Sequence, residues 1–193
     1  MIGLLWVVLS ASASPRVGAV MEPDDVVAQY RLHAKAKGKQ GPEAELLCKA
    51  AVEGLQVCAS VVEGGAWRYA THADVDVKSP TESLDGPKLG FVRKSVEGIG
   101  GYWVRSENDG RSGLVFVQPE RLQALSPAGL VVAWPQPGVV IAWVPGNPSL
   151  DQVLSVGVAK MFEATNHPIS KKIYRHDGEE WLVWGEAKAP EVP

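Results

Sequence analysis

The sequence predicts an α+β fold, in which an antiparallel sheet carries a helix packed on one face and follows a smaller N-terminal lobe of helix and hairpin. Two observations support this prediction. Residues 130–184 hold short runs of β-branched and aromatic residues on both sides of a stretch with helical spacing. These two patterns are typical of strands and of an amphipathic helix. The chain has 193 residues, which suits one domain of ordinary size or two small lobes.

The C-terminal unit begins with two expected strands, residues 129–134 and 139–144, because both runs are short, apolar and separated by Pro and Gly. Neither run alternates between apolar and polar residues, so both faces of the sheet should be at least partly covered. Helical spacing starts at residue 150, where Asn147 or Ser149 is placed to cap the helix. The apolar positions of this helix are Leu150, Val153, Leu154, Val158, Met161 and Phe162.

Pro168 ends this helix, because proline lacks a backbone N–H and disfavours helical geometry at the residue before it. Residues 169–175 and 180–184 are then expected to form two further strands. The Asp-Gly pair at Asp177 and Gly178 lies between them and is a strong hairpin signal. The C-terminal part of the chain is therefore predicted to be a ββαββ unit.

The N-terminal lobe, residues 21–72, is expected to hold two helices and a hairpin. The first helix covers residues 21–37, where aspartates lie at the start and lysines at the end, the charge order that a helix dipole favours. The second covers residues 43–53, where apolar residues lie on one helical face. The hairpin strands cover residues 55–62 and 67–71, where valines and aromatic residues flank a Gly-rich turn.

A loop over residues 73–88 separates the lobe from the C-terminal domain, residues 89–187, because Asp, Ser, Pro and Gly crowd this stretch. Before its ββαββ unit the domain is expected to form three further strands. These strands cover residues 89–94, 102–105 and 114–118.

The N-terminal segment, residues 1–19, resembles a secretory signal peptide, because an uninterrupted apolar run is followed by small residues. Cleavage is expected after Ala13 or Ala19, which predicts a secreted or periplasmic protein. The alternative is translation from Met21, which predicts a cytoplasmic protein. No later apolar run is long enough to span a membrane.

The two cysteines, Cys48 and Cys58, allow two interpretations. On one continuous helix they would lie about 15 Å apart, at a rise of about 1.5 Å per residue, which is too far for a disulfide. They can bond only if the helix stops near Gly54 and the chain turns back. The other interpretation is two small, buried and unreactive apolar residues.

The formal net charge of −3 argues against nucleic-acid binding, because no basic face is available to neutralise phosphates. No histidine lies at metal-ligand spacing with another histidine or a cysteine, so no metal or cofactor is expected. Lys35, Lys37 and Lys39 are interpreted as the solvated end of the first helix, where positive charge suits the helix dipole. A binding patch is the alternative interpretation of these lysines.

The candidate functional surface consists of His167, Ser170, Asp177 and Trp181. Ser170 and the nearby His167 offer a nucleophile and a base, but no nucleophile elbow accompanies Ser170, and a helix end explains the same residues. Asp177 lies in the expected hairpin turn. Trp181 is one of several tryptophans within residues 130–184, which belong in a core unless they form an exposed face for a protein, peptide or glycan.

The order of these C-terminal segments resembles that of a bacterial family known as the domain of unknown function 1444. The resemblance rests on residues 133–142, the helix that ends at Phe162, the segment 167–170 and the turn at 174–178. It covers residues 114–184. It implies a strand, a Pro-containing turn, an apolar strand, a helix and an Asp-Gly turn before the last strand, and it implies no known activity.

These observations predict a non-catalytic binding or interaction protein that is exported to the bacterial envelope and recognises a protein or peptide partner. One alternative is a small hydrolase-like enzyme that uses His167 and Ser170. The other is a cytoplasmic regulatory protein that starts at Met21.

Overall fold

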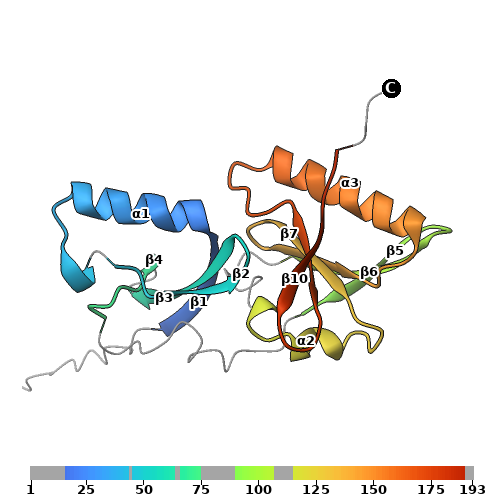
Figure 1. Ribbon diagram of the computed structural model, residues 1–193, viewed down its shortest axis with the longest axis horizontal. Helices are drawn as coiled ribbons and strands as arrows, with labels where there is room; N and C mark the ends of the chain where they lie inside the picture. The colour runs from blue at the N-terminus through green and yellow to red at the C-terminus, as the bar shows by residue number, and fades with distance from the viewer. Residues whose placement is uncertain (1–15, 44, 64–65, 75–89, 107–114, 190–193) are drawn as a thin grey trace, which may run out of the picture.

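The computed structural model describes residues 16–43, 45–63, 66–74, 90–106 and 115–189. Within this part of the chain, two antiparallel sheets and their helices form two neighbouring bodies, the N-terminal one smaller than the C-terminal one (Figure 1). The predicted α+β fold class is confirmed.

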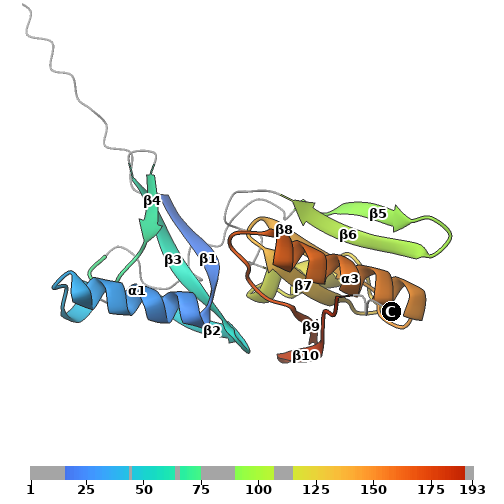
Figure 2. The ribbon, with the colours of Figure 1, turned by 90° about the horizontal axis from the view of Figure 1, so that it is seen from above.

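The N-terminal sheet is built on its long strand β3 (Leu55–Glu63). One edge of β3 pairs with β1 (Arg16–Pro23), and the other edge is shared by β2 (Cys48–Val52) and β4 (Ala66–Tyr69). Helix α1 (Asp24–Ala36) follows β1 directly and lies across this sheet (Figure 2). The predicted hairpin of the N-terminal lobe therefore exists, but it is part of a larger sheet.

Helix α1 begins at Asp24, three residues after the predicted start at residue 21, because β1 stays paired with β3 up to Pro23. Asp24 and Asp25 occupy its first turn, where their negative charge suits the helix dipole. The side chains of Val27 and Ala34 are buried against the sheet. Their spacing of seven residues places them on one face of the helix, which fixes how α1 is rotated about its axis.

The predicted helix over residues 43–53 is wrong. A short 3-10 helix, η1 (Gly41–Glu43), is followed by strand β2, whose backbone pairs with β3. The chain reverses at Gly54, which has a φ of 81° and so occupies the left-handed region that glycine adopts without a steric cost. Pairing with β3 therefore decided the structure of a segment whose short apolar run is ambiguous between helix and strand.

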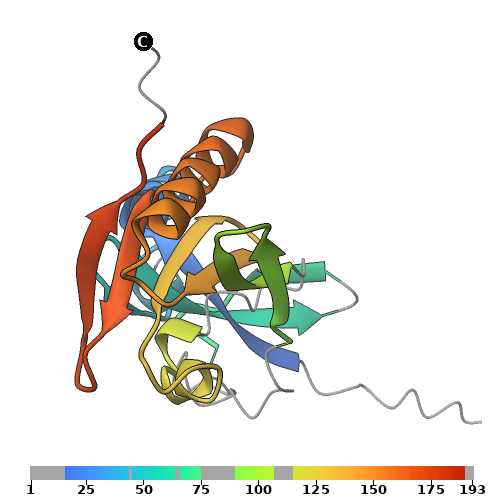
Figure 3. The same cartoon turned by 90° about the vertical axis from the view of Figure 1, so that its right-hand side faces the viewer.

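The C-terminal sheet contains six described strands in the order β10-β9-β7-β8-β6-β5, and every neighbouring pair is antiparallel. The strands are β5 (Val92–Val96), β6 (Gly100–Ser106), β7 (Val131–Gln136), β8 (Val139–Trp143), β9 (Lys172–His176) and β10 (Trp181–Glu186). Helix α3 (Pro148–Ala164) crosses one face of the sheet, and the short helix α2 (Glu120–Gln123) lies on the other side (Figure 3). The predicted ββαββ unit, β7 to β10 with α3, is confirmed.

Strands β7 and β8 are covered on both faces, as their uninterrupted apolar sequences predicted. Val131 and Ile141 pack in the same cluster as Leu154 of α3. The neighbouring residues Val132 and Val140 point to the opposite face and pack with a second cluster. The central strands of the larger sheet therefore form the middle layer of the core.

The predicted strand over residues 114–118 is wrong for the residues that the structure describes. Val115 and Phe116 lie in a 3-10 helical turn, and both are buried. The ring of Phe116 packs against Tyr174 and Trp181, with centroid distances of 5.3 Å and 4.8 Å. These residues are apolar because they fill the core beneath the sheet, without joining its ladder of hydrogen bonds.

Of the two predicted caps of α3, Asn147 is the one that the structure confirms. The Asn147 side chain accepts hydrogen bonds from the backbone N–H of Ser149 at 3.1 Å and of Leu150 at 3.2 Å. Pro148 occupies the first turn, where its missing N–H costs nothing. None of the described helices combines the length and the apolar character needed to cross a bilayer.

The two sheets meet where the β2–β3 turn packs against β9. Lys172 Nζ lies 2.6 Å from Glu53 Oε1, and the Tyr174 hydroxyl donates to the backbone carbonyl of Glu53 at 3.3 Å. Leu55 and Val57 of β3 also join the core cluster beneath the C-terminal sheet. Apolar packing and polar contacts therefore hold the two bodies together at this point.

Replacing Tyr174 with Phe is expected to lower the free energy of unfolding by about 1–2 kcal/mol, because it removes a buried hydroxyl that bonds to Ser170 and Glu53. Urea unfolding followed by tryptophan fluorescence measures this loss. The control is Tyr102→Phe, since the Tyr102 hydroxyl has no hydrogen bond among the described residues and should leave stability nearly unchanged. An equal effect of both substitutions would contradict the proposed role of the contact.

Candidate functional site: a basic pocket beside helix α1

A cavity of about 680 Å³ opens between the C-terminal half of α1, the loop that follows it, and the segment that leads into β2. This cavity is called the α1 pocket below. Its basic lining residues are Arg31, Lys35, Lys39 and His72. Its other lining residues are Gln40, Gly41, Glu45, Leu46 and Cys48. The volume falls within the range of about 300–1,000 Å³ that is usual for small-molecule sites.

The α1 wall follows from helical spacing. Val27 and Ala34 hold the buried face of α1 against the sheet. Arg31 lies four residues after Val27, and Lys35 lies four residues after Arg31 and directly follows Ala34. Residues four apart share one side of a helix, so both cations flank the buried stripe on the same side. Lys37 falls on the other side of the stripe and does not line the pocket.

The opposite wall is formed by two short segments that pair with each other. The backbone N–H of Leu47 donates to Ala70 at 3.0 Å, and that of His72 donates to Glu45 at 3.1 Å. Leu46 and Thr71 form a bridge between these bonds. This pairing brings His72, which follows β4, beside Glu45, which precedes β2.

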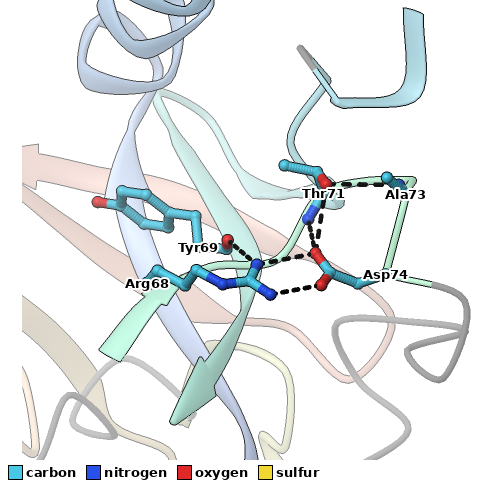
Figure 4. Close-up of polar contacts among 5 residues, drawn as sticks. All are labelled: Arg68, Tyr69, Thr71, Ala73 and Asp74. Carbon is cyan, nitrogen blue, oxygen red and sulfur yellow. Dashed lines mark hydrogen bonds and ion pairs between the residues drawn. The ribbon is translucent and has the colours of Figure 1, made fainter. Parts of the chain in front are cut away.

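A polar network fixes the turn that carries His72 (Figure 4). The Arg68 guanidinium donates to both carboxylate oxygens of Asp74, at 2.6 Å and 3.0 Å. Asp74 also accepts from the backbone N–H of Thr71 at 2.7 Å. The hydrogen bond from Arg68, with help from Thr71, lowers the pKa of Asp74 to about 2. His72 therefore lies in a turn whose conformation is held from both sides.

Replacing Asp74 with Asn is expected to cost about 0.5–1 kcal/mol at pH 7, since the half-exposed Arg68 partner is screened by solvent. The folded-state pKa of about 2 lies below the ordinary 3.8, so the ionised form stabilises the fold above that value. The contribution is lost as the pH falls from about 4 towards 2. Urea unfolding at pH 7 and pH 2.5 should show a difference between the two proteins that shrinks in acid, whereas a pH-independent difference would contradict the assignment.

The electrostatics of the α1 pocket oppose the charge of the whole chain. Arg31, Lys35 and Lys39 contribute three positive charges and Glu45 one negative charge, so the lining carries +2 with His72 neutral. The whole chain carries −3. Among the residues that the structure describes, no hydrogen bond or ion pair engages the side chains of these three cations. They are thus free to bind an anion.

The floor of the pocket is apolar and contains a disulfide. Cys48 and Cys58 are bonded and directly opposite each other on β2 and β3, with their Cα atoms 4.0 Å apart. Cys58 is fully buried and Leu46 is nearly so. The disulfide forms because β2 is a strand that turns back at Gly54, so the alternative of two unbonded cysteines is wrong.

The four residues of the sequence-predicted surface do not come together. His167 and Ser170 precede β9, whereas Asp177 and Trp181 follow it. The five-residue strand between them spans about 17 Å at 3.4 Å per residue. The two halves of the predicted surface therefore lie at opposite ends of one strand.

The surroundings of Ser170 are those of a structural residue. Its side chain is buried, its oxygen lies 3.0 Å from the Tyr174 hydroxyl, and it accepts from the backbone N–H of Lys172 at 3.0 Å. Within the described chain, no histidine or carboxylate is hydrogen-bonded to it. Burial raises the pKa of Glu22, and a hydrogen bond to Tyr69 and the nearby, exposed His167 offset part of that rise.

Asp177 and Trp181 also have structural partners. Asp177 accepts from the backbone N–H groups of Glu179 and Glu180, which lowers its pKa and closes the β9–β10 turn. The Trp181 indole donates to the Phe116 carbonyl at 2.8 Å. Trp184 points to the opposite face, where its ring lies 6.5 Å from that of Trp143, and it remains 41% exposed.

No protein-family model matches this chain, and neither a curated protein nor a solved structure matches it. The function has to be inferred from the residues themselves. No group of three or more His, Cys, Asp or Glu side chains with the geometry of a metal site occurs in the described ranges.

Proposed function

We propose that this protein is a non-catalytic binding protein that holds a small anionic ligand in the α1 pocket. The observation that carries the proposal is the gathering of Arg31, Lys35 and Lys39 around one cavity in a chain of net negative charge. Arginine and lysine recognise carboxylate and phosphate oxygens through charge-assisted hydrogen bonds. The expectation of a protein or peptide partner stays a prediction.

Titration calorimetry with citrate at low ionic strength tests this proposal. Wild type should bind citrate, and the double variant Lys35→Gln/Lys39→Gln should bind it about 10- to 30-fold more weakly. Each lost contact is worth about 1 kcal/mol at 4 Å in water, and 1.4 kcal/mol is a factor of ten.

The matched control is Lys37→Gln/Lys49→Gln. Lys37 shares the helix end with Lys35 and Lys39, and Lys49 follows Cys48, but neither lines the pocket. Both double variants lose two positive charges from the chain. Equal weakening in both would mean that citrate senses only the overall charge, and the proposed site would be lost.

The proposed location is an oxidising compartment such as the bacterial envelope. The Cys48–Cys58 disulfide supports this, because such bonds persist outside the reducing cytoplasm, and the apolar N-terminal segment supports it independently.

Intact-mass analysis of the protein purified from its own compartment should give an N-terminus at Ser14. Cleavage after Ala13 leaves β1, Arg16–Pro23, whole, whereas cleavage after Ala19 or translation from Met21 removes half of that strand or more. An N-terminus at Met21 would contradict the exported location. One at Val20 would contradict the requirement for an intact β1.

The resemblance of residues 114–184 to the domain of unknown function 1444 remains a proposal about the fold. Its support is the order strand, turn, strand, helix and hairpin in β7 to β10. The pocket lies outside the residues that the resemblance covers, so the two proposals stand separately.

A further inference from the structure

We propose that the ligand of the α1 pocket is a small organic dianion, either a dicarboxylate or a phosphate monoester. This inference rests on the proposed function and adds the number of charges that the ligand carries. Both chemical classes present two negative charges within a few ångströms, which is the property that the lining selects.

The charge of the α1 pocket comes from cations on two separate parts of the chain. Arg31 and Lys35 come from α1, and Lys39 comes from the loop beyond it, so the cations belong to two separate elements. A ligand with one negative charge would leave a net charge of +1 in the cavity, so the cations of the lining would still repel one another. A dianion balances the lining charge of +2.

The α1 pocket also contains one carboxylate, that of Glu45. Glu45 lines the same cavity, and its backbone carbonyl is fixed by the bond from His72. Its negative charge lowers the benefit of a third or fourth charge on the ligand, because that charge would lie near Glu45. A trianion such as citrate can therefore bind but gains little over a dianion, and a neutral ligand is disfavoured.

The floor of the α1 pocket is apolar. Leu46 and Cys48 offer an apolar surface beneath the cations, which suits the carbon skeleton of an organic acid better than a fully hydrated inorganic ion. Glutamine and glycine, at Gln40 and Gly41, complete the loop side without adding charge.

The ordinary explanation of these lysines is the solvated end of a helix, where any cation offsets the dipole. That explanation treats Lys35, Lys37 and Lys39 alike. The pocket distinguishes them, because Lys37 lies outside its lining. The two accounts therefore predict different responses to the same substitution at neighbouring positions.

The experiment is a valence series at constant pH and ionic strength, measured by calorimetry on the full chain. The carboxylate arm compares succinate, its monoamide succinamate and the neutral succinamide, which share one skeleton. The phosphate arm compares glycerol 3-phosphate with glycerol. Wild type should bind one or both dianions about 10-fold more tightly than succinamate, since one added charge contact is worth roughly 1 kcal/mol or more.

The variants Arg31→Gln and Lys39→Gln each remove one cation from one element, and each should reduce the preference for the dianion to about 3-fold or less. Lys37→Gln should retain the wild-type preference. The arm with the tighter dianion identifies whether the ligand is a dicarboxylate or a phosphate monoester.

Equal binding of succinate and succinamate in wild type, with citrate still bound, would overturn the dianion inference and leave the proposed function in place. A preference that Lys37→Gln abolishes as completely as Arg31→Gln would also overturn it. Failure of wild type to bind every anion tested, citrate included, would overturn both proposals.

Discussion

Replacing Arg31 and Lys35 with Glu is expected to weaken citrate binding by at least about 100-fold. The double substitution changes the lining charge from +2 to −2, because each replacement removes a positive charge and adds a negative one. Each lost attraction and each new repulsion is worth roughly 1 kcal/mol at 4 Å in water, and more where the cavity wall excludes solvent. Calorimetry at low ionic strength measures the loss.

The control for this experiment is Lys49→Glu/Lys94→Glu, which gives the chain the same total charge. Both lysines are exposed and lie outside the pocket. Circular dichroism of all three proteins checks that the fold persists. Citrate affinity that falls equally in both double variants would show that the pocket has no special role.

Removing the disulfide with Cys48→Ala/Cys58→Ala is expected to lower the free energy of unfolding by about 2–3 kcal/mol. The bond closes a loop with a sequence separation of 10 residues, and the chain-entropy relation assigns this amount to a loop of that size. The same change should weaken ligand binding, because Cys48 and its neighbour Leu46 form the pocket floor on the short edge strand β2.

Urea unfolding with and without a reducing agent separates the bond from the substitutions. The wild type should lose stability on reduction, and the double Ala variant should be insensitive to the reductant. Unchanged stability of the wild type after complete reduction, confirmed by thiol counting, would contradict the stabilising role of the bond.

The C-terminal unit was predictable because local signals and packing agree there. Asn147 caps α3, and Pro148 starts it. Gly178, with a φ of 117°, closes the hairpin that the Asp-Gly pair predicted. Local sequence and tertiary structure favour the same conformation at each of these positions. The secondary structure of such a segment can therefore be predicted from its sequence.

Strand β2 was not predictable for the opposite reason. Residues 48–52 are short, weakly apolar and rich in alanine, a composition that favours a helix when nothing else is considered. Their strand conformation comes from pairing with β3 and from the turn at Gly54. The disulfide stayed an open alternative for the same reason, since a continuous helix would have kept Cys48 and Cys58 apart.

The pocket was only partly visible in the sequence. Lys35 and Lys39 form a charged helix end in the sequence, and the four-residue spacing of Arg31 and Lys35 beside Val27 and Ala34 indicates that they share one side of that helix. His72 comes from a distant segment, and its place depends on the pairing of residues 45–47 with 70–72. Contacts of this kind between separate segments leave no local pattern.

The most direct test of the central claim is a residue-by-residue map of where an anion binds. Backbone amide NMR signals of the ¹⁵N-labelled protein are followed during titration with succinate or glycerol 3-phosphate. We expect the largest shifts at Arg31, Lys35, Gln40, Gly41 and His72, with little change at His167, Ser170 or Asp177. Shifts that gather around β9, or that spread over every exposed lysine, would contradict the central claim.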